Sequence, residues 1–156
     1  MSLSVEERLQ RIEDMEAIRS LRRKYHIYIN EGRFADMAEL FTPGAAIDFG
    51  SVGKASGSAE IREFYLSAGK SLDLIVQFIH NHEVEVDRDK ASGVAYMDAR
   101  YARDGVSMIV AGRFSESYAR TSLGWKIDRM EVASFFTVPL SEGWAGEAIN
   151  QARPFD

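Results

Sequence analysis

The chain contains no cysteine, which excludes disulfide bonds, thiol nucleophiles and thiolate metal ligands together. Its beginning is charged, and no apolar run is long enough for a signal peptide or a membrane-spanning helix. Basic residues number 19 against 24 acidic residues, a net charge of −5, and no lysine and arginine stripe could follow a phosphate backbone. We therefore expect a cytoplasmic, soluble protein that binds neither nucleic acid nor a membrane.

The remaining composition is that of a globular protein. Of the 156 residues, 46% are hydrophobic and 28% are charged, a balance that can bury a core and that disordered chains lack. The length suits one domain, and neither an internal repeat nor a linker interrupts it. We expect residues 1–156 to form a single domain.

The first half of the chain predicts helices. Apolar residues recur there at steps of three and four, which is typical of an amphipathic helix with one buried stripe: Leu9, Ile12, Met15, Ile18, Leu21, Tyr25 and Tyr28. Ser4 and Glu7 can form a capping box at its start, and Gly32 can end it. A short helix around 34–41, a short strand at 45–49, a Gly/Ser loop at 50–57 and a helix at 58–68 follow.

From Phe78 onward the apolar period changes from about four residues to two, which predicts strands. They span about 78–87, 91–102, 106–120 and 125–138, and only short turns separate them. Long strands joined by tight hairpins form an antiparallel meander that must twist and curl. Helices followed by a strongly curved antiparallel sheet make an α+β fold.

Alternation along these strands predicts which side chains face inward. The inward set is soft and apolar, which suits a cavity for a small molecule: Met97, Tyr101, Met108, Val110, Phe114, Met130 and Val132. A solid core with adaptable side chains explains the same residues equally well. The opposite face carries Tyr96, Ile109 and Phe135, which predicts a homodimer or a higher homo-oligomer.

Two histidines stand in the first of these strands. His80 and His82 are two residues apart, so regular alternation places both on the face shared by Phe78 and Val84. A titratable pair on an apolar face suits general acid–base chemistry in a cavity, and it also suits a polar patch satisfied within a core. A metal would need a third inward ligand, and His26 is expected to face solvent, so we predict no metal site.

Several short motifs together resemble the nuclear transport factor 2-like cone fold, in particular its SnoaL-like branch. They are Ile18-Arg-Ser-Leu21 leading to Tyr25 and Asn30, Gly32-Arg-Phe34, Leu40-Phe41, Ala46-Ile-Asp-Phe49, His80, Gly112-Arg-Phe114 with Tyr118, Gly124-Trp125-Lys-Ile127 and the ending Pro139-Leu-Ser-Glu-Gly-Trp144. The resemblance covers nearly the whole chain. It implies helices packed on a cone-shaped sheet around an apolar cavity.

The resemblance also implies a site. Dehydratase and dehydrochlorinase members pair an aspartate at a helix end with a strand histidine, and these positions fall on Asn30 and on His80, or on His82 after a short gap. Tyr25 and Phe49 are expected to line the same cavity. An asparagine fixes an imidazole tautomer but cannot stabilise its charged form, which weakens a base.

Two functions follow as expectations. The first is the binding of a small apolar molecule, cyclic or aromatic, with cofactor-free lyase, dehydratase or isomerase chemistry centred on His80. The alternative is a non-catalytic ligand-binding protein, or an assembly subunit resembling the dioxygenase β subunits.

Overall fold

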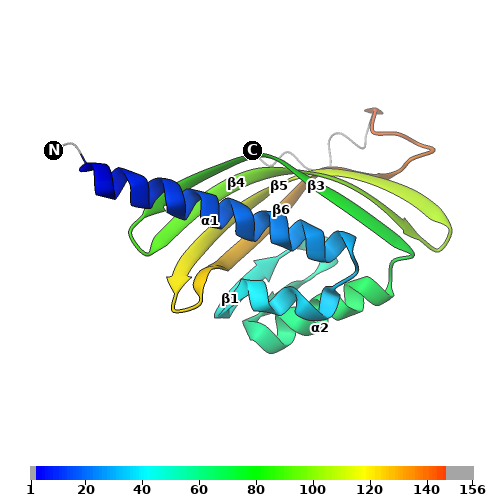
Figure 1. Ribbon diagram of the computed structural model, residues 1–156. Coiled ribbons are helices and arrows are strands. Elements are labelled where there is room, and N and C mark those ends of the chain that lie inside the picture. The colour runs from blue at the N-terminus through cyan, green and yellow to red at the C-terminus, as the bar shows by residue number, and fades with distance from the viewer. Residues whose placement is uncertain (1–2, 147–156) are drawn as a thin grey trace.

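The computed structural model describes residues 3–146, in which two α-helices and a six-stranded sheet form the main body (Figure 1). Helix α1 spans Val5–Asn30 and α2 spans Gly57–Lys70. Two 3₁₀ turns, η1 at Phe34–Leu40 and η2 at Gly50–Val52, connect the elements between the two helices. The predicted α+β class is confirmed.

The predicted capping box at the start of α1 is present. Ser4 Oγ accepts a hydrogen bond from the Glu7 amide at 3.1 Å, and the Glu7 carboxylate accepts one from the Ser4 amide at 2.7 Å. The helix ends before Gly32, whose φ of +70° is a conformation that glycine adopts without strain. Both ends of this helix could therefore be predicted from local sequence.

The predicted buried stripe of α1 is correct only for its C-terminal part. Ile18 and Tyr25 are buried, whereas Leu9 and Ile12 are 55% and 63% exposed. The first turns of α1 extend past the strands, so they have no sheet beneath them to cover their apolar side chains (Figure 1).

The sheet consists of β1 (Phe41–Asp48), β2 (Lys54–Ser56), β3 (Leu74–Asp87), β4 (Lys90–Arg103), β5 (Val106–Thr121) and β6 (Gly124–Pro139). The strand order is β2-β1-β6-β5-β4-β3, and the sheet is curved and does not close. Strands β3 to β6 form the predicted antiparallel meander, and the added β1 pairs parallel to β6, which makes the sheet mixed. The Gly/Ser stretch predicted as a loop contains η2 and β2.

Both helices lie on the concave face of the sheet (Figure 1). Helix α1 crosses β3 and reaches β6, while α2 packs on η1 and β1. In this arrangement no helix of residues 3–146 covers the opposite, convex face of β3 to β6, and the space between sheet and helices is surrounded on several sides.

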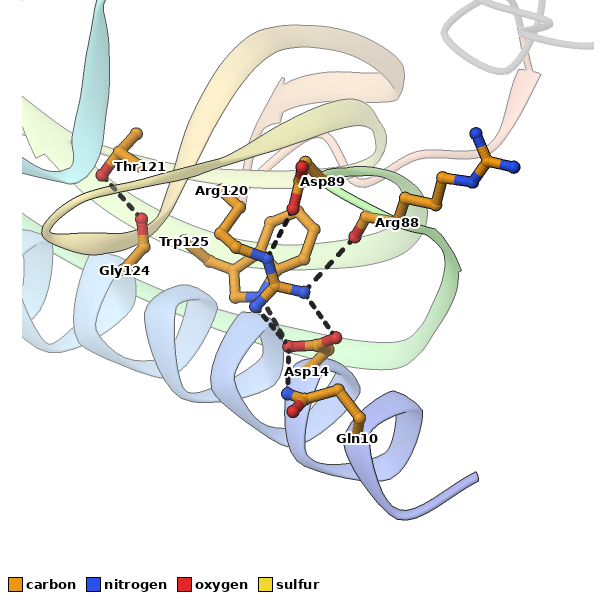
Figure 2. Close-up of polar contacts among 8 residues, drawn as sticks. All are labelled: Gln10, Asp14, Arg88, Asp89, Arg120, Thr121, Gly124 and Trp125. Atoms are coloured by element: carbon orange, nitrogen blue, oxygen red, sulfur yellow. Dashed lines mark hydrogen bonds and ion pairs between the residues drawn. The ribbon is translucent and has the colours of Figure 1, made fainter. Parts of the chain in front are cut away.

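A buried carboxylate fastens α1 to two hairpins (Figure 2). Asp14 accepts two hydrogen bonds from Arg120, at 2.8 and 2.7 Å, and a third from the Trp125 indole at 3.1 Å. Arg120 also donates to Asp89 in the β3–β4 turn at 2.9 Å. These bonds, with Arg120 first among them, lower the pKa of Asp14, so the carboxylate remains charged and bound. Its role is to position the helix that covers the sheet.

Candidate ligand-binding site

A large cavity lies between α1, α2 and the concave face of the sheet. Its volume is about 1340 Å³, above the ~300–1,000 Å³ typical of small-molecule sites, so it has room for a ring system with substituents. The lining is a mixture of aromatic, aliphatic and polar side chains. Its aromatic residues come from both helices, from η1, from the position after β1 and from β4 and β6: Tyr25, Phe34, Phe49, Phe64, Tyr65, Tyr101 and Phe136. Such walls favour a flat, apolar ligand.

Two phenol groups face each other in this cavity. The hydroxyl oxygens of Tyr25, on α1, and Tyr65, on α2, lie 3.0 Å apart, and both side chains are buried. Burial raises the pKa of Tyr25 to about 12 and that of Tyr65 well above its ordinary value, so both stay protonated near neutral pH.

Among the described residues, one of the two phenol protons has no strong acceptor. A single proton lies between the two oxygens, so the other must point elsewhere, and the Tyr65 hydroxyl lies 4.0 Å from Met130 Sδ. A thioether sulfur is a weak acceptor. A ligand oxygen that reached this pair from the cavity would accept a stronger hydrogen bond than the thioether does.

Gln77 also lines the cavity, from β3. Its Oε1 is buried and has no hydrogen-bond partner among the described residues. Its backbone is held by Asn30, whose Oδ1 accepts from the Gln77 amide at 2.7 Å and whose Nδ2 donates to the Gln77 carbonyl at 2.9 Å. Because β3 is an edge strand, Asn30 pairs with backbone groups that no neighbouring strand reaches.

The two histidines of β3 do not share a face, which corrects the sequence prediction. Asn81 has a φ of +50° and interrupts the pairing of β3 with β4 between His80 and Glu83, a β-bulge that shifts the alternation by one residue. His80 is consequently exposed and lies opposite Tyr96 in the register, whereas His82 turns inward. Phe78, which has the same side-chain direction as His80, is exposed as well.

The predicted pairing of His80 with Asn30 is therefore wrong. Both ends of the Asn30 amide bind the backbone of Gln77, and His80 does not line the cavity. The inward position of β3 beside Asn30 belongs to Gln77, which sequence reasoning missed because nothing in the residues around Asn81 marks the bulge.

His82 belongs to a buried polar cluster outside the cavity lining. Its Nε2 lies 3.1 Å from the Tyr118 hydroxyl, which donates a short hydrogen bond to Glu116. Glu116 in turn forms an ion pair of 3.2 Å with Nε of Arg22, and both of those side chains are fully buried. Gly93 makes room for this cluster, since a Cβ there would lie 3.0 Å from the Tyr118 ring.

His26 is part of the same cluster, contrary to the expectation that it faces solvent. It is 5% exposed, and its Nε2 lies 3.4 Å from Nη2 of Arg22. Burial first, and then the charge of Arg22, lower the pKa of His26 to about 2, and the same two causes lower that of His82 to about 4. Both imidazoles are neutral near pH 7, and the cluster carries one buried ion pair.

The other predicted pocket residues divide into two groups. Six line the cavity as expected: Tyr25, Phe49, Met97, Tyr101, Val110 and Val132. Phe114 and Met130 are instead fully buried in the core, and Met108 lies outside the cavity lining. Tyr65 also lines the cavity, from α2, although the predicted pocket did not include it. The signal that could have found it is its place on the apolar face of the helix predicted at 58–68.

Within 3–146, no group of three or more histidine, aspartate or glutamate side chains is placed to hold a metal ion. None of the helices in that range is long and apolar enough to span a membrane.

The geometry defines a cone-shaped α+β protein with a cavity between its helices and its sheet, and comparison with known proteins gives its family. The SnoaL-like domain profile matches residues 10–131, and the chain therefore belongs to the SnoaL-like family. An uncharacterized protein of Mycobacterium tuberculosis is 29% identical over 131 residues, which cover 81% of this chain and 86% of that protein.

Solved structures share the fold. A candidate aromatic ring hydroxylase from Novosphingobium aromaticivorans is 26% identical, with a TM-score of 0.77 over 84% of this chain and 96% of the other. Hexachlorocyclohexane dehydrochlorinase from Novosphingobium barchaimii is 18% identical, with a TM-score of 0.78 over 85% and 94%. A candidate scytalone dehydratase from N. aromaticivorans is 16% identical, with a TM-score of 0.75 over 81% and 87%.

Proposed function

We propose that this protein binds a small, largely apolar molecule, cyclic or aromatic, that carries a hydrogen-bond-accepting oxygen. The observation that carries the proposal is the Tyr25–Tyr65 phenol pair inside a cavity walled by aromatic rings. The walls supply apolar contact area, and the pair supplies one hydrogen-bond donor for which residues 3–146 offer no strong acceptor.

The relatives support the ligand class without defining the ligand. The names of two solved neighbours refer to an aromatic ring and to hexachlorocyclohexane, both of which are cyclic and mainly apolar. Their likeness to this chain is one of fold, and the polar groups that face the cavity here are this chain's own.

A matched pair of ligands tests the proposal. Indane and 1-indanone have the same ring frame, and only the ketone can accept a hydrogen bond. We expect both to bind in isothermal titration calorimetry, with the ketone bound more tightly. Tyr65→Phe removes one hydroxyl and should weaken the ketone about three- to tenfold, as expected for one neutral hydrogen bond worth ~1 kcal/mol, and leave indane unchanged.

Tyr96→Phe is the control for this experiment. It makes the same chemical change on the convex face, where Tyr96 stacks on Phe135 with ring centroids 6.2 Å apart. It should leave both affinities unchanged. Failure of both ring compounds to bind, or an equal loss of both in Tyr65→Phe, would refute the proposal.

Cofactor-free elimination or isomerisation on the same ligand is the second candidate function, and the phenol pair favours it. Protonated phenols can donate to an oxygen on which negative charge develops during proton abstraction. No histidine lines the cavity among the described residues, which include all three, and the lining carboxylates Glu60 and Glu63 are the candidate bases.

Proton exchange distinguishes an enzyme from a binding protein. In deuterium oxide, a catalyst would exchange the α-protons of bound 1-indanone faster than buffer does, as followed by proton NMR. Tyr65→Phe should slow that exchange, and His80→Ala should not change it. Absence of protein-dependent exchange on ligands that bind would leave ligand binding as the function.

A further inference from the structure

An arginine stands at the mouth of the cavity. Arg103 is the last residue of β4 and follows Tyr101 by two positions, so both side chains belong to the same face of the strand. The Arg103 guanidinium lies 5.8 Å from the centre of the Tyr101 ring. It is exposed, and it lines the cavity together with Ser71.

One edge of this guanidinium is fixed by the end of α2. Nε of Arg103 donates to the Ser71 carbonyl at 3.2 Å, and Nη2 donates to Ser71 Oγ at 3.2 Å. Ser71 is the residue that ends α2, so the arginine also satisfies a carbonyl at the helix terminus. The side chain is therefore held in one orientation before any ligand binds.

The other edge of the guanidinium is available. A guanidinium has five N–H donors, and Ser71 takes one on Nε and one on Nη2. The donors that remain, two on Nη1 and one on Nη2, form the fork that a carboxylate binds with two parallel hydrogen bonds. Within residues 3–146, Arg103 forms no ion pair with an aspartate or glutamate, whereas Arg100 on the same strand is paired with Asp98.

We infer that the ligand of this cavity is a cyclic or aromatic carboxylic acid, whose carboxylate binds Arg103 at the mouth while its ring lies among the aromatic walls. The inference rests on the proposed function, because it requires a ring in the cavity. It adds to that function a charged contact between the ligand and Arg103. Arginine held by Ser71 loses little side-chain freedom on binding, and its planar fork matches a carboxylate better than an ammonium would.

The test compares an acid with its neutral analogue. 1-Naphthoate and 1-naphthamide share a ring system and differ in charge near neutral pH. We expect calorimetry to show naphthoate bound at least about tenfold more tightly, as charge-assisted hydrogen bonds are stronger than neutral ones. Arg103→Gln should remove that preference by weakening naphthoate about tenfold while leaving naphthamide within twofold. Arg103→Lys, which keeps the charge and loses the fork, should retain part of it.

Arg100→Gln is the matched control, since it removes the same charge three positions earlier on β4 and on the opposite face of the strand. It should leave both affinities unchanged, and binding of naphthamide by each variant shows that the cavity remains folded. If naphthoate and naphthamide bind equally in the wild type, or if Arg103→Gln and Arg100→Gln weaken naphthoate to the same degree, the inference is overturned and the proposed function stands. If naphthalene compounds and 1-indanone all fail to bind, both are overturned.

Discussion

The buried ion pair between Arg22 and Glu116 should dominate the response of the fold to single substitutions. Glu116→Gln removes the negative charge and keeps the side-chain shape, so the guanidinium, which stacks 4.4 Å from the Tyr25 ring centre and 4.5 Å from that of Phe114, stays buried without a counter-charge. Breaking a buried pair in this way costs about 3–5 kcal/mol. The expected loss is a large share of the ~5–15 kcal/mol that stabilises a typical domain.

Urea unfolding followed by far-ultraviolet circular dichroism measures that cost, and thermal unfolding should show a fall in Tm of roughly 6–20 °C for a protein of this size. The Arg22→Met variant should be destabilised to a similar extent. The double variant should be more stable than the sum of the two single losses implies, by about 2 kcal/mol or more, because it removes both charges together.

The exposed pair of Arg129 and Glu131 serves as the comparison. These side chains are 62% and 49% exposed although their atoms approach to 2.6 Å, so solvent screens the attraction. The coupling between Arg129→Met and Glu131→Gln should be below about 1 kcal/mol. A loss of less than about 1 kcal/mol for Glu116→Gln, or equal coupling in the buried and exposed cycles, would show that the buried pair does not stabilise the fold as we argue.

Three further predictions concern other parts of the molecule. Burial lowers the pKa of His26 to about 2, so this histidine binds a proton in the unfolded chain at a higher pH than in the folded protein. The stability that the neutral His26 side chain contributes is complete above pH ~6.5 and falls by about 1.4 kcal/mol for each pH unit below it. Urea unfolding should therefore show that the free energy of unfolding of His26→Gln, relative to wild type, is roughly 2–3 kcal/mol more favourable near pH 4.5 than at neutral pH. Asn30→Ala should lower the free energy of unfolding by about 1–2 kcal/mol and speed hydrogen exchange of the Gln77 backbone amide, which loses its acceptor. An unchanged exchange rate would contradict the role of Asn30 in holding the Gln77 backbone. The convex face, which no helix of the described residues covers, carries the stacked rings of Tyr96 and Phe135 and predicts a homodimer or higher homo-oligomer. Phe135→Lys should lower the mass measured by light scattering, whereas a wild-type monomer would refute this prediction.

Local sequence determined the elements and the class of fold. The Ser4–Glu7 capping box, the four-residue apolar step in the first helix and the two-residue step after Phe78 each depend on neighbours within a few positions. The turns between the long strands are equally local. The parallel pairing of β1 with β6 was not predictable in this way, because no short-range signal chooses which edge a distant strand joins.

The sequence by itself also predicted a soft, apolar inward face, and six of the predicted pocket residues line the cavity. Which polar groups face that cavity was decided by tertiary structure. A single residue, Asn81, in a left-handed conformation turned His80 outward and left Gln77 beside Asn30. Alternation infers the direction of each side chain from that of its neighbour along the strand. One bulge without a clear sequence signal therefore reverses the predicted inward or outward direction of every residue on one side of it.

The buried ion pair illustrates the same division. Regular alternation from Phe114 places Glu116 on the inward face of β5. Arg22 stands in a basic cluster with Arg23 and Lys24, which the sequence predicts to be a solvated helix face, and the structure buries it fully. Neither pattern shows that the two charges meet at 3.2 Å, because their contact joins elements more than ninety residues apart. Sequence periodicity fixes the direction of a side chain within its own element, and only the packing of the helix on the sheet decides which partner it finds.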